Sequence, residues 1–247
     1  MSSGRKRIDV LLVERGLAPS RERAQSLILA GQVLCDDVPV TKAGQQVLVA
    51  AQIRVRGEDH PYVSRGGLKL AAALDGFKLD VSDRVGLDVG ASTGGFTHVL
   101  LLRGATRVHA VDVGHNQLDW RLRTDSRVHV REKVNAREMG FEVVGEKVGI
   151  IVADLSFISL EKVLPNLRQF AGSETDWVTL FKPQFEVGRE SVGKGGIVTD
   201  EAARENAFQR VVASLGEQGF TCLGRMDSPI RGTEGNVEYL VHWRFSP

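Results

Sequence analysis

The 247-residue sequence predicts an α/β fold whose main part is a doubly wound, largely parallel sheet, preceded by a small α+β domain. From residue 85 onwards, short apolar runs of strand length alternate with apolar runs of helical spacing, the pattern of parallel strands joined by helices. Three of the strand-like runs end in charged residues, Asp112, Asp154 and Lys182, as expected where parallel strands open onto one ligand crevice. We therefore expect a small domain over residues 1–59 and a larger one over 60–247.

The composition is that of an ordinary globular protein, with 42% hydrophobic residues, 26% charged residues and a formal net charge of +1. No apolar run reaches the roughly 18 residues of a membrane span, and the N-terminus lacks the apolar stretch of a signal peptide. We therefore expect a cytoplasmic protein that does not bind membranes. Cys35 and Cys222 match no metal-ligand spacing, so no metal is expected. Nothing in the sequence indicates an oligomeric state.

The first sixty residues predict two helices and a few strands. The apolar residues of 5–17 share one helical face, and a second helix is expected from Ser20, a suitable N-cap, to Gly31. Residues 33–40 alternate like a short hairpin, and residues 46–55 predict one further strand.

Residues 1–35 hold six Lys/Arg against three Asp/Glu, which gives this stretch a basic character. Two of the basic residues, Arg21 and Arg23, lie in the first turn of the second helix, where the helix dipole disfavours positive charge by a few tenths of a kcal/mol or more. Either a bound anion offsets this cost or the two side chains are simply solvated.

The order of helix caps, glycines and basic positions in this stretch resembles the small RNA-binding module first seen in a ribosomal protein, the S-four-type domain. The matching run is Arg7-Ile8-Asp9, Leu12, Gly16-Leu17, Ser20-Arg21, Ala24, Ile28 and Gly31-Gln32-Val33. The resemblance implies contacts with RNA phosphates from Arg5, Arg7, Arg21 and Arg23.

A glycine-rich turn dominates the larger domain. Residues 85–89 predict a buried strand and residues 96–102 an apolar helix, so the turn between them directs free backbone N–H groups outward. Glycines there let the backbone turn tightly and a ligand approach closely. Asp112 ends the next strand, 22 residues after Gly90, a spacing that suits a carboxylate bound to ribose hydroxyls. This pattern predicts a nucleoside-cofactor site. The expected cofactor contacts are Asp88, Gly90, Ala91, Ser92, Gly94, Gly95, Phe96, Asp112, Asn135 and Asp154.

Asn135, at the end of the third predicted strand, serves either the adenine edge or a turn.

The remaining elements are expected in the following order: a linker over 56–61, a turn over 64–67, a helix from Lys69, strands over 127–130 and 148–154, a helix from Leu155 to Leu160, a strand over 177–183, a helix over 201–216 and two antiparallel strands over 220–225 and 236–243.

Residues 184–200 predict a long glycine-rich loop that carries Arg189 and Lys194. Such a loop is either a flexible connector or a segment that covers or receives a substrate.

A final antiparallel pair after the alternating strands, together with the run Asp88-Val89-Gly90-Ala91-Ser92, resembles class I S-adenosylmethionine-dependent methyltransferases. Neither a G-x-G-x-x-G dinucleotide fingerprint nor a G-x-x-x-x-G-K-[ST] phosphate loop is present. Four charged residues, Lys69, Asp154, Lys182 and Glu238, resemble in order the Lys-Asp-Lys-Glu set of FtsJ-like ribose 2′-O-methyltransferases.

The whole chain resembles the TlyA (hemolysin A) family of ribosomal RNA methyltransferases, through residues 64–69, 88–90, 154–158 and 182–186. The resemblance implies S-adenosylmethionine as cofactor, methylation of cytidines in 16S or 23S ribosomal RNA, and ribosomal subunits as partners. It makes Lys69, Asp154, Lys182 and Glu238 the expected catalytic residues. It also makes Arg65, Arg189 and Lys194 further candidates for RNA contact.

A ribose 2′-hydroxyl is a weak nucleophile, so catalysis needs in-line positioning and a route for its proton. We expect Lys182 to be the general base or the group that orients the hydroxyl. A base role requires a lowered pKa, which burial or the charge of Lys69 would favour. Otherwise Lys182 steers the hydroxyl and water takes the proton. Asp154 and Glu238 would hold the two amines.

The sequence disfavours three other functions. A base methyltransferase is disfavoured because Asp154-Leu155-Ser156-Phe157 stands where an Asn-Pro-Pro-Tyr-type motif would be. A non-enzymatic RNA-binding protein with a vestigial pocket is disfavoured by the intact glycines and charged strand ends. A membrane-lytic activity, which the family's older name suggests, lacks a strongly amphipathic cationic helix.

Overall fold

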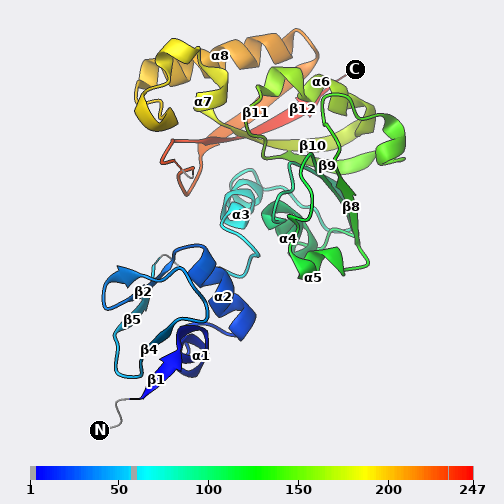
Figure 1. Cartoon of the computed structure of the whole chain (residues 1–247). Helices are drawn as coiled ribbons and strands as arrows, with labels where there is room; N and C mark the ends of the chain where they lie inside the picture. Colours follow the sequence, from blue (N-terminus) through cyan, green and yellow to red (C-terminus); the bar gives the residue numbers. More distant parts are fainter. Residues whose placement is uncertain (1–3, 57–59, 233, 247) are drawn as a thin grey trace. The chain divides into compact units, whose positions relative to one another are not determined.

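A computed structural model describes residues 4–56, 60–232 and 234–246. The chain divides into two compact units, Met1–His60 and Pro61–Pro247. Both are drawn in Figure 1. Most of the expected linker falls on residues 57–59, which lie outside the described residues. No helix in the described part of the chain is long and apolar enough to cross a membrane.

The N-terminal unit packs two helices against short strands around an apolar core that includes Ile8, Leu12 and Ile28. Strand β1 pairs with β4, while β3, β2 and β5 form a three-stranded sheet. The elements are β1 (Arg5–Arg7), α1 (Ile8–Glu14), α2 (Arg21–Leu29), β2 (Val33–Cys35), β3 (Val38–Pro39), β4 (Gln46–Leu48) and β5 (Ile53–Val55).

Two expectations for this unit need correction. The predicted single strand over 46–55 is two strands in different sheets, because the chain turns after β4, where the Ala51 N–H donates to the Leu48 carbonyl. Residues 5–7 form a strand, so the first helix begins only at Ile8. The second helix is capped by the Ser20 hydroxyl, which accepts from the Arg23 N–H at 3.2 Å.

The larger unit is built on a seven-stranded sheet in the order β11-β12-β10-β9-β6-β7-β8. Strands β6 to β10 run parallel, whereas β12 is antiparallel to both β10 and β11. This confirms the predicted doubly wound sheet with a final antiparallel strand. The strands are β6 (Val85–Val89), β7 (Arg107–Asp112), β8 (Val128–Glu132), β9 (Val148–Ala153), β10 (Ala171–Phe181), β11 (Phe220–Asp227) and β12 (Tyr239–Phe245).

Helices cover both faces of this sheet, as Figure 1 shows. Apolar strand residues alternate between the faces, so that Ile150 and Ile151 belong to different core clusters. The helices are α3 (Gly66–Gly76), α4 (Gly95–Leu102), α5 (Trp120–Arg123), α6 (Leu164–Leu167), α7 (Pro183–Glu186) and α8 (Glu201–Gly216). Short 3-10 turns lie at Phe141–Val143, Leu160–Lys162, Arg168–Phe170, Arg189–Ser191 and Lys194–Gly196.

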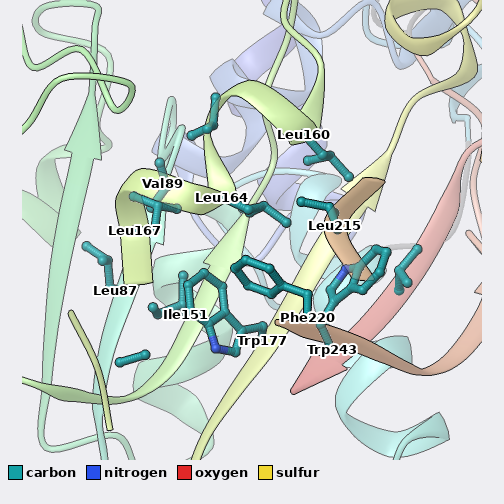
Figure 2. Packing of buried hydrophobic residues seen from close by; sticks show 14 of the residues in the cluster. Leu87, Val89, Ile151, Leu160, Leu164, Leu167, Trp177, Leu215, Phe220 and Trp243 are labelled. Atoms are coloured by element: carbon teal, nitrogen blue, oxygen red, sulfur yellow. The ribbon is translucent and has the colours of Figure 1, made fainter. Parts of the chain in front are cut away.

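One core face packs beneath α6 and α8 and contains the largest buried aromatic side chains (Figure 2). Trp177 meets Phe220 edge to face with ring centroids 5.1 Å apart, and Trp243 donates from its indole N–H to Thr179 at 2.9 Å. This packing fixes β10 and β12 side by side, which matters because two of the expected catalytic residues lie at their ends.

The sequence predictions were inaccurate at several element boundaries. Residues 155–159 form an irregular loop rather than a helix, and Phe157 there has φ of 65° and a 90% exposed side chain. Helix α3 begins at Gly66, so Lys69 lies inside its first turn and does not start the helix. The expected loop over 184–200 contains most of helix α7 and two 3-10 turns.

Candidate active site

The carboxyl ends of the parallel strands meet the amino end of β12, because β12 runs in the opposite direction. Asp154 follows β9, Lys182 follows β10, and Glu238 directly precedes β12. Lys69 reaches the same place from α3. All four side chains line one cavity of about 260 Å³, so the structure brings the four expected catalytic residues together.

The four residues form two ion pairs. Lys69 Nζ lies 2.6 Å from Glu238 Oε2, and Lys182 Nζ lies 2.6 Å from Asp154 Oδ1. Lys182 Nζ also donates to the Ser156 hydroxyl at 3.0 Å. The Lys69 and Glu238 side chains are only 10% and 3% exposed. Because burying an isolated charge is costly, each of these two groups depends on the other inside the site.

The glycine turn borders this cavity. Gly90 has φ of +82°, and a Cβ placed on it would lie 2.4 Å from the Asp154 backbone oxygen. The Gly90 and Ala91 N–H groups both donate to the Val111 carbonyl, which fixes the turn between β6, β7 and β9. Glycine is therefore required at position 90 by the backbone of the neighbouring strand end. The turn residues that line the cavity are Gly90, Ala91, Ser92, Thr93, Gly95 and Phe96.

A second cavity, of about 570 Å³, adjoins the first and shares Gly90, Ser92 and Asp154 with it. Asp112 lines this cavity with a fixed carboxylate: Oδ2 accepts from the Ser92 N–H at 2.7 Å and Oδ1 from the Gly114 N–H at 2.6 Å. These bonds leave lone pairs on both oxygens for a ligand.

Asn135 also lines the second cavity, and its Oδ1 accepts from the Arg137 N–H at 3.1 Å. The residue therefore forms a local turn and lies beside the cavity. Apolar side chains, among them Val111, Val134 and Ile158, complete the lining.

Asp88 and Gly94, two of the expected cofactor contacts, line neither cavity. Asp88 is fully buried, and its Oδ2 accepts from the Thr97 N–H at 2.8 Å and from the Thr97 hydroxyl at 2.6 Å. It thus holds the first turn of α4 against the end of β6. Burial raises the pKa of this carboxyl to about 7. A threonine nine residues after Asp88 was the sequence signal for this buried contact, and sequence reasoning missed it.

Glycine is required at position 94 for helix packing. It lies at φ of +93°, and a Cβ placed on it would meet Leu122 at 2.3 Å. Its role is to let α4 begin against α5.

The expected RNA-contact residues of this unit lie in two places. Arg65 is exposed and lines the first cavity. Arg189 and Lys194 are exposed in the 3-10 turns after α7 and do not line it. Sequence reasoning missed Ile230 and Arg231, which line the cavity from the loop between β11 and β12. The signal was available in that loop, since a basic residue between two turn-forming segments precedes Glu238.

The arginines of the N-terminal unit have a partner that the sequence did not reveal. Asp9 is fully buried and accepts from Arg7 at 3.0 and 2.8 Å, from Arg21 Nε at 3.0 Å and from Gln25 at 3.1 Å. These partners, Arg7 above all, hold the pKa of the Asp9 carboxyl well below its usual range. The anion that offsets the position of Arg21 at the start of α2 is therefore supplied by the chain itself.

Arg5 is exposed, and Arg23 donates to the His60 carbonyl at 3.3 Å.

Within the described ranges, no group of three or more His, Cys, Asp or Glu side chains is arranged to hold a metal ion.

Comparison with known proteins gives two family matches. The FtsJ-like methyltransferase family matches residues 62–245, and the S4 domain matches residues 6–53. The 16S/23S rRNA (cytidine-2′-O)-methyltransferase TlyA of Mycobacterium tuberculosis is 48% identical over 97% of this chain and 90% of its own length. Hemolysin A of Brachyspira hyodysenteriae is 42% identical over 96% of this chain and 99% of its own. A solved structure from Streptococcus thermophilus, described as a candidate hemolysin, is 40% identical with a TM-score of 0.77, covering 99% of this chain and 90% of its own.

Proposed function

This chain belongs to the TlyA family of FtsJ-like methyltransferases, and from that membership we propose that it methylates the ribose 2′-hydroxyl of cytidines in ribosomal RNA. The methyl donor is S-adenosylmethionine, and the substrates are ribosomal subunits in the cytoplasm. One observation carries the proposal beyond family likeness. Lys69, Asp154, Lys182 and Glu238 converge in two ion pairs on a cavity beside the glycine turn.

The two adjoining cavities suit a nucleoside cofactor with a charged tail. The carboxylate of Asp112, fixed by two backbone N–H groups, is an acceptor for ribose hydroxyls. Asn135 and the apolar side chains of the second cavity would hold the base, and the turn from Gly90 to Ser92 would hold the part that extends toward the catalytic residues. Bound there, S-adenosylmethionine supplies a methyl group already activated by its sulfonium.

The chain's own contribution is to place the 2′-hydroxyl, whose proton passes to water while Lys182 is charged or to the Lys182 amine if that amine is neutral. Lys182 is ion-paired with Asp154 and donates to Ser156, which holds its amine at the wall of the cavity with a further position open to the hydroxyl oxygen. Lys69, paired with Glu238, forms the opposite part of the same cluster and adds positive charge where the oxygen becomes more negative. A substrate held between the two pairs is oriented for in-line attack.

The N-terminal unit supplies RNA affinity in this proposal. Arg5 is exposed, and Arg7 and Arg21 keep side chains 41% and 52% exposed while their guanidinium groups are fixed by Asp9. Fixed arginines lose less freedom when they bind a phosphate than free ones do. Arg189 and Lys194, exposed beyond α7, are proposed as further phosphate contacts.

The intact ion pairs disfavour a purely RNA-binding role, since a protein without chemistry gains little from a buried and a half-buried lysine–carboxylate pair lining one cavity. The test is direct transfer. Purified protein, ribosomal subunits that lack the modification and isotopically labelled methyl donor are incubated, and the RNA is digested to nucleosides. The proposal expects labelled 2′-O-methylcytidine; a label found only on bases, or no transfer with donor bound, contradicts it.

A further inference from the structure

The charges around the first cavity are not balanced. Four cationic side chains line it, and Lys69 and Lys182 are paired with the two carboxylates, Glu238 and Asp154. The other two cations, Arg65 and Arg231, are exposed. Neither forms an ion pair with any carboxylate in the described ranges. The mouth of the cavity therefore carries two guanidinium groups available for an anionic ligand.

Arg231 directly precedes a turn in which the described residues Gly232, Gly235 and Asn236 are joined by hydrogen bonds. The Gly232 N–H donates to the Asn236 carbonyl at 3.0 Å, and the Gly235 N–H donates to the Gly232 carbonyl at 2.9 Å. Arg231 Nη1 donates to the Gly235 carbonyl at 3.1 Å, which leaves its other N–H groups for a ligand. The turn passes directly against the catalytic cluster, because a Cβ placed on Gly232 would lie 2.6 Å from Glu238 Oε1.

Asn236 fixes the base of this turn. Its side chain is buried, with Nδ2 donating to the Gly196 carbonyl at 2.9 Å and Oδ1 accepting from the Val198 N–H at 3.0 Å. One buried amide thus ties the turn that carries Arg231 to the glycine-rich segment that follows α7. The position of Arg231 is set by internal hydrogen bonds.

We propose that Arg231 is a substrate-binding residue that contacts an RNA phosphate next to the target ribose, and that Asn236 is its positioning residue. The inference rests on the proposed function, since every internal ribose of an RNA strand is flanked by a phosphodiester on each side. Guanidinium groups bind phosphate oxygens in a bidentate geometry. With Arg65 on the same cavity, the two arginines hold the strand while the lysine–carboxylate pairs act on the hydroxyl between the phosphates.

The experiment compares wild-type protein with Arg231→Ala in RNA binding at several salt concentrations and in steady-state methylation of ribosomal subunits. Loss of one phosphate contact should reduce the salt slope of RNA binding by about 0.7–0.9. The KM for RNA should rise about tenfold, with kcat changed less than threefold. Affinity for S-adenosylhomocysteine, measured by calorimetry, should stay unchanged. Arg103→Ala, which removes an exposed arginine at the far end of α4, is the control and should change none of these values.

Asn236→Asp removes the donor to Gly196 with little change of shape, so its KM for RNA should also rise. In the double variant it should add little to Arg231→Ala, because both act through the same side chain. An unchanged salt slope and KM in Arg231→Ala would overturn the inference, and so would weaker S-adenosylhomocysteine binding, which would place Arg231 on the donor. Wild-type protein in the same assay reports on the proposed function, and RNA binding tests Arg231 even if no methyl is transferred.

Discussion

Lys69 and Glu238 are 169 residues apart in the sequence, yet their charged groups lie 2.6 Å from each other and line the same cavity. The contact joins α3, which precedes the sheet, to the start of its last strand. Folding of the whole larger unit is therefore needed to build the site.

The pair should be strongly coupled. Lys69→Met or Glu238→Gln alone leaves one buried charge without its partner, which typically costs about 3–5 kcal/mol of unfolding free energy. The double variant should recover most of that loss, as denaturant unfolding would show, while methyl transfer stays absent in all three. Losses that simply add in the double variant would mean that the two groups do not depend on each other.

Gly90→Ala should reduce both stability and cofactor binding. The added methyl would lie 2.4 Å from the Asp154 backbone oxygen at a left-handed φ. We expect a loss of about 1–3 kcal/mol and weaker S-adenosylhomocysteine binding by calorimetry. Gly145→Ala is a matched control, because Gly145 has a similar φ of +79° with no atom within 4 Å of the added Cβ. Equal effects on cofactor binding in the two variants would contradict the role given to the turn.

Asp88 should make stability depend on pH. Burial raises the pKa of its carboxyl to about 7, whereas an unfolded aspartate titrates near 4. The folded state therefore binds the proton more tightly, and this contribution to stability is lost as pH rises from about 4 to 7. Asp88→Asn keeps an acceptor for Thr97 but does not titrate, so its melting temperature should fall less than that of the wild type between pH 5 and 7.5. Parallel curves for the two proteins would refute this assignment.

Asp9 should stabilise the N-terminal unit in the opposite pH direction. Its pKa is lowered by Arg7 and its other partners, so its contribution is present above about pH 4 and lost as the pH falls below that value. Asp9→Asn removes the charge between two arginines and should destabilise this unit by about 3 kcal/mol. Hydrogen exchange resolved by residue would show faster exchange in α1 and α2 but not in β9 or β10. Exchange that is unchanged in all four elements would show that the carboxylate is not needed.

The sequence was most informative where a residue pattern is compatible with only one kind of secondary structure. Apolar runs that end in Asp112, Asp154 and Lys182 predicted the parallel sheet. Strands of such a sheet are buried on both faces, and their carboxyl ends border the ligand crevice. The sequence was least informative about which polar side chains meet once the chain has folded. The residue pattern did not show that Asp9 binds Arg7 and Arg21, or that the turn at Gly232 passes against Glu238.

Other errors came from propensity. The sequence predicts a helix over residues 155–160, but residues 155–159 form a loop in which Phe157 has a positive φ and is exposed beside Phe185. The position of Asp88 beside the glycine turn suggested a cofactor ligand. Side chains alternate between the two faces of β6, however, and that of Asp88 points into the protein, where it accepts hydrogen bonds from Thr97.

Replacement of Lys182 is the most direct test of the central claim, that paired charges at the strand ends drive methyl transfer to a ribose hydroxyl. Lys182→Ala and Lys182→Arg are compared with wild type for methylation of ribosomal subunits, with S-adenosylhomocysteine affinity measured alongside. Lys182→Ala should lose at least about a hundredfold in rate with donor affinity unchanged, as expected for loss of a group that moves or orients a proton. Partial activity in Lys182→Arg would show orientation by charge, since arginine stays protonated. A wild-type rate in Lys182→Ala would contradict the account.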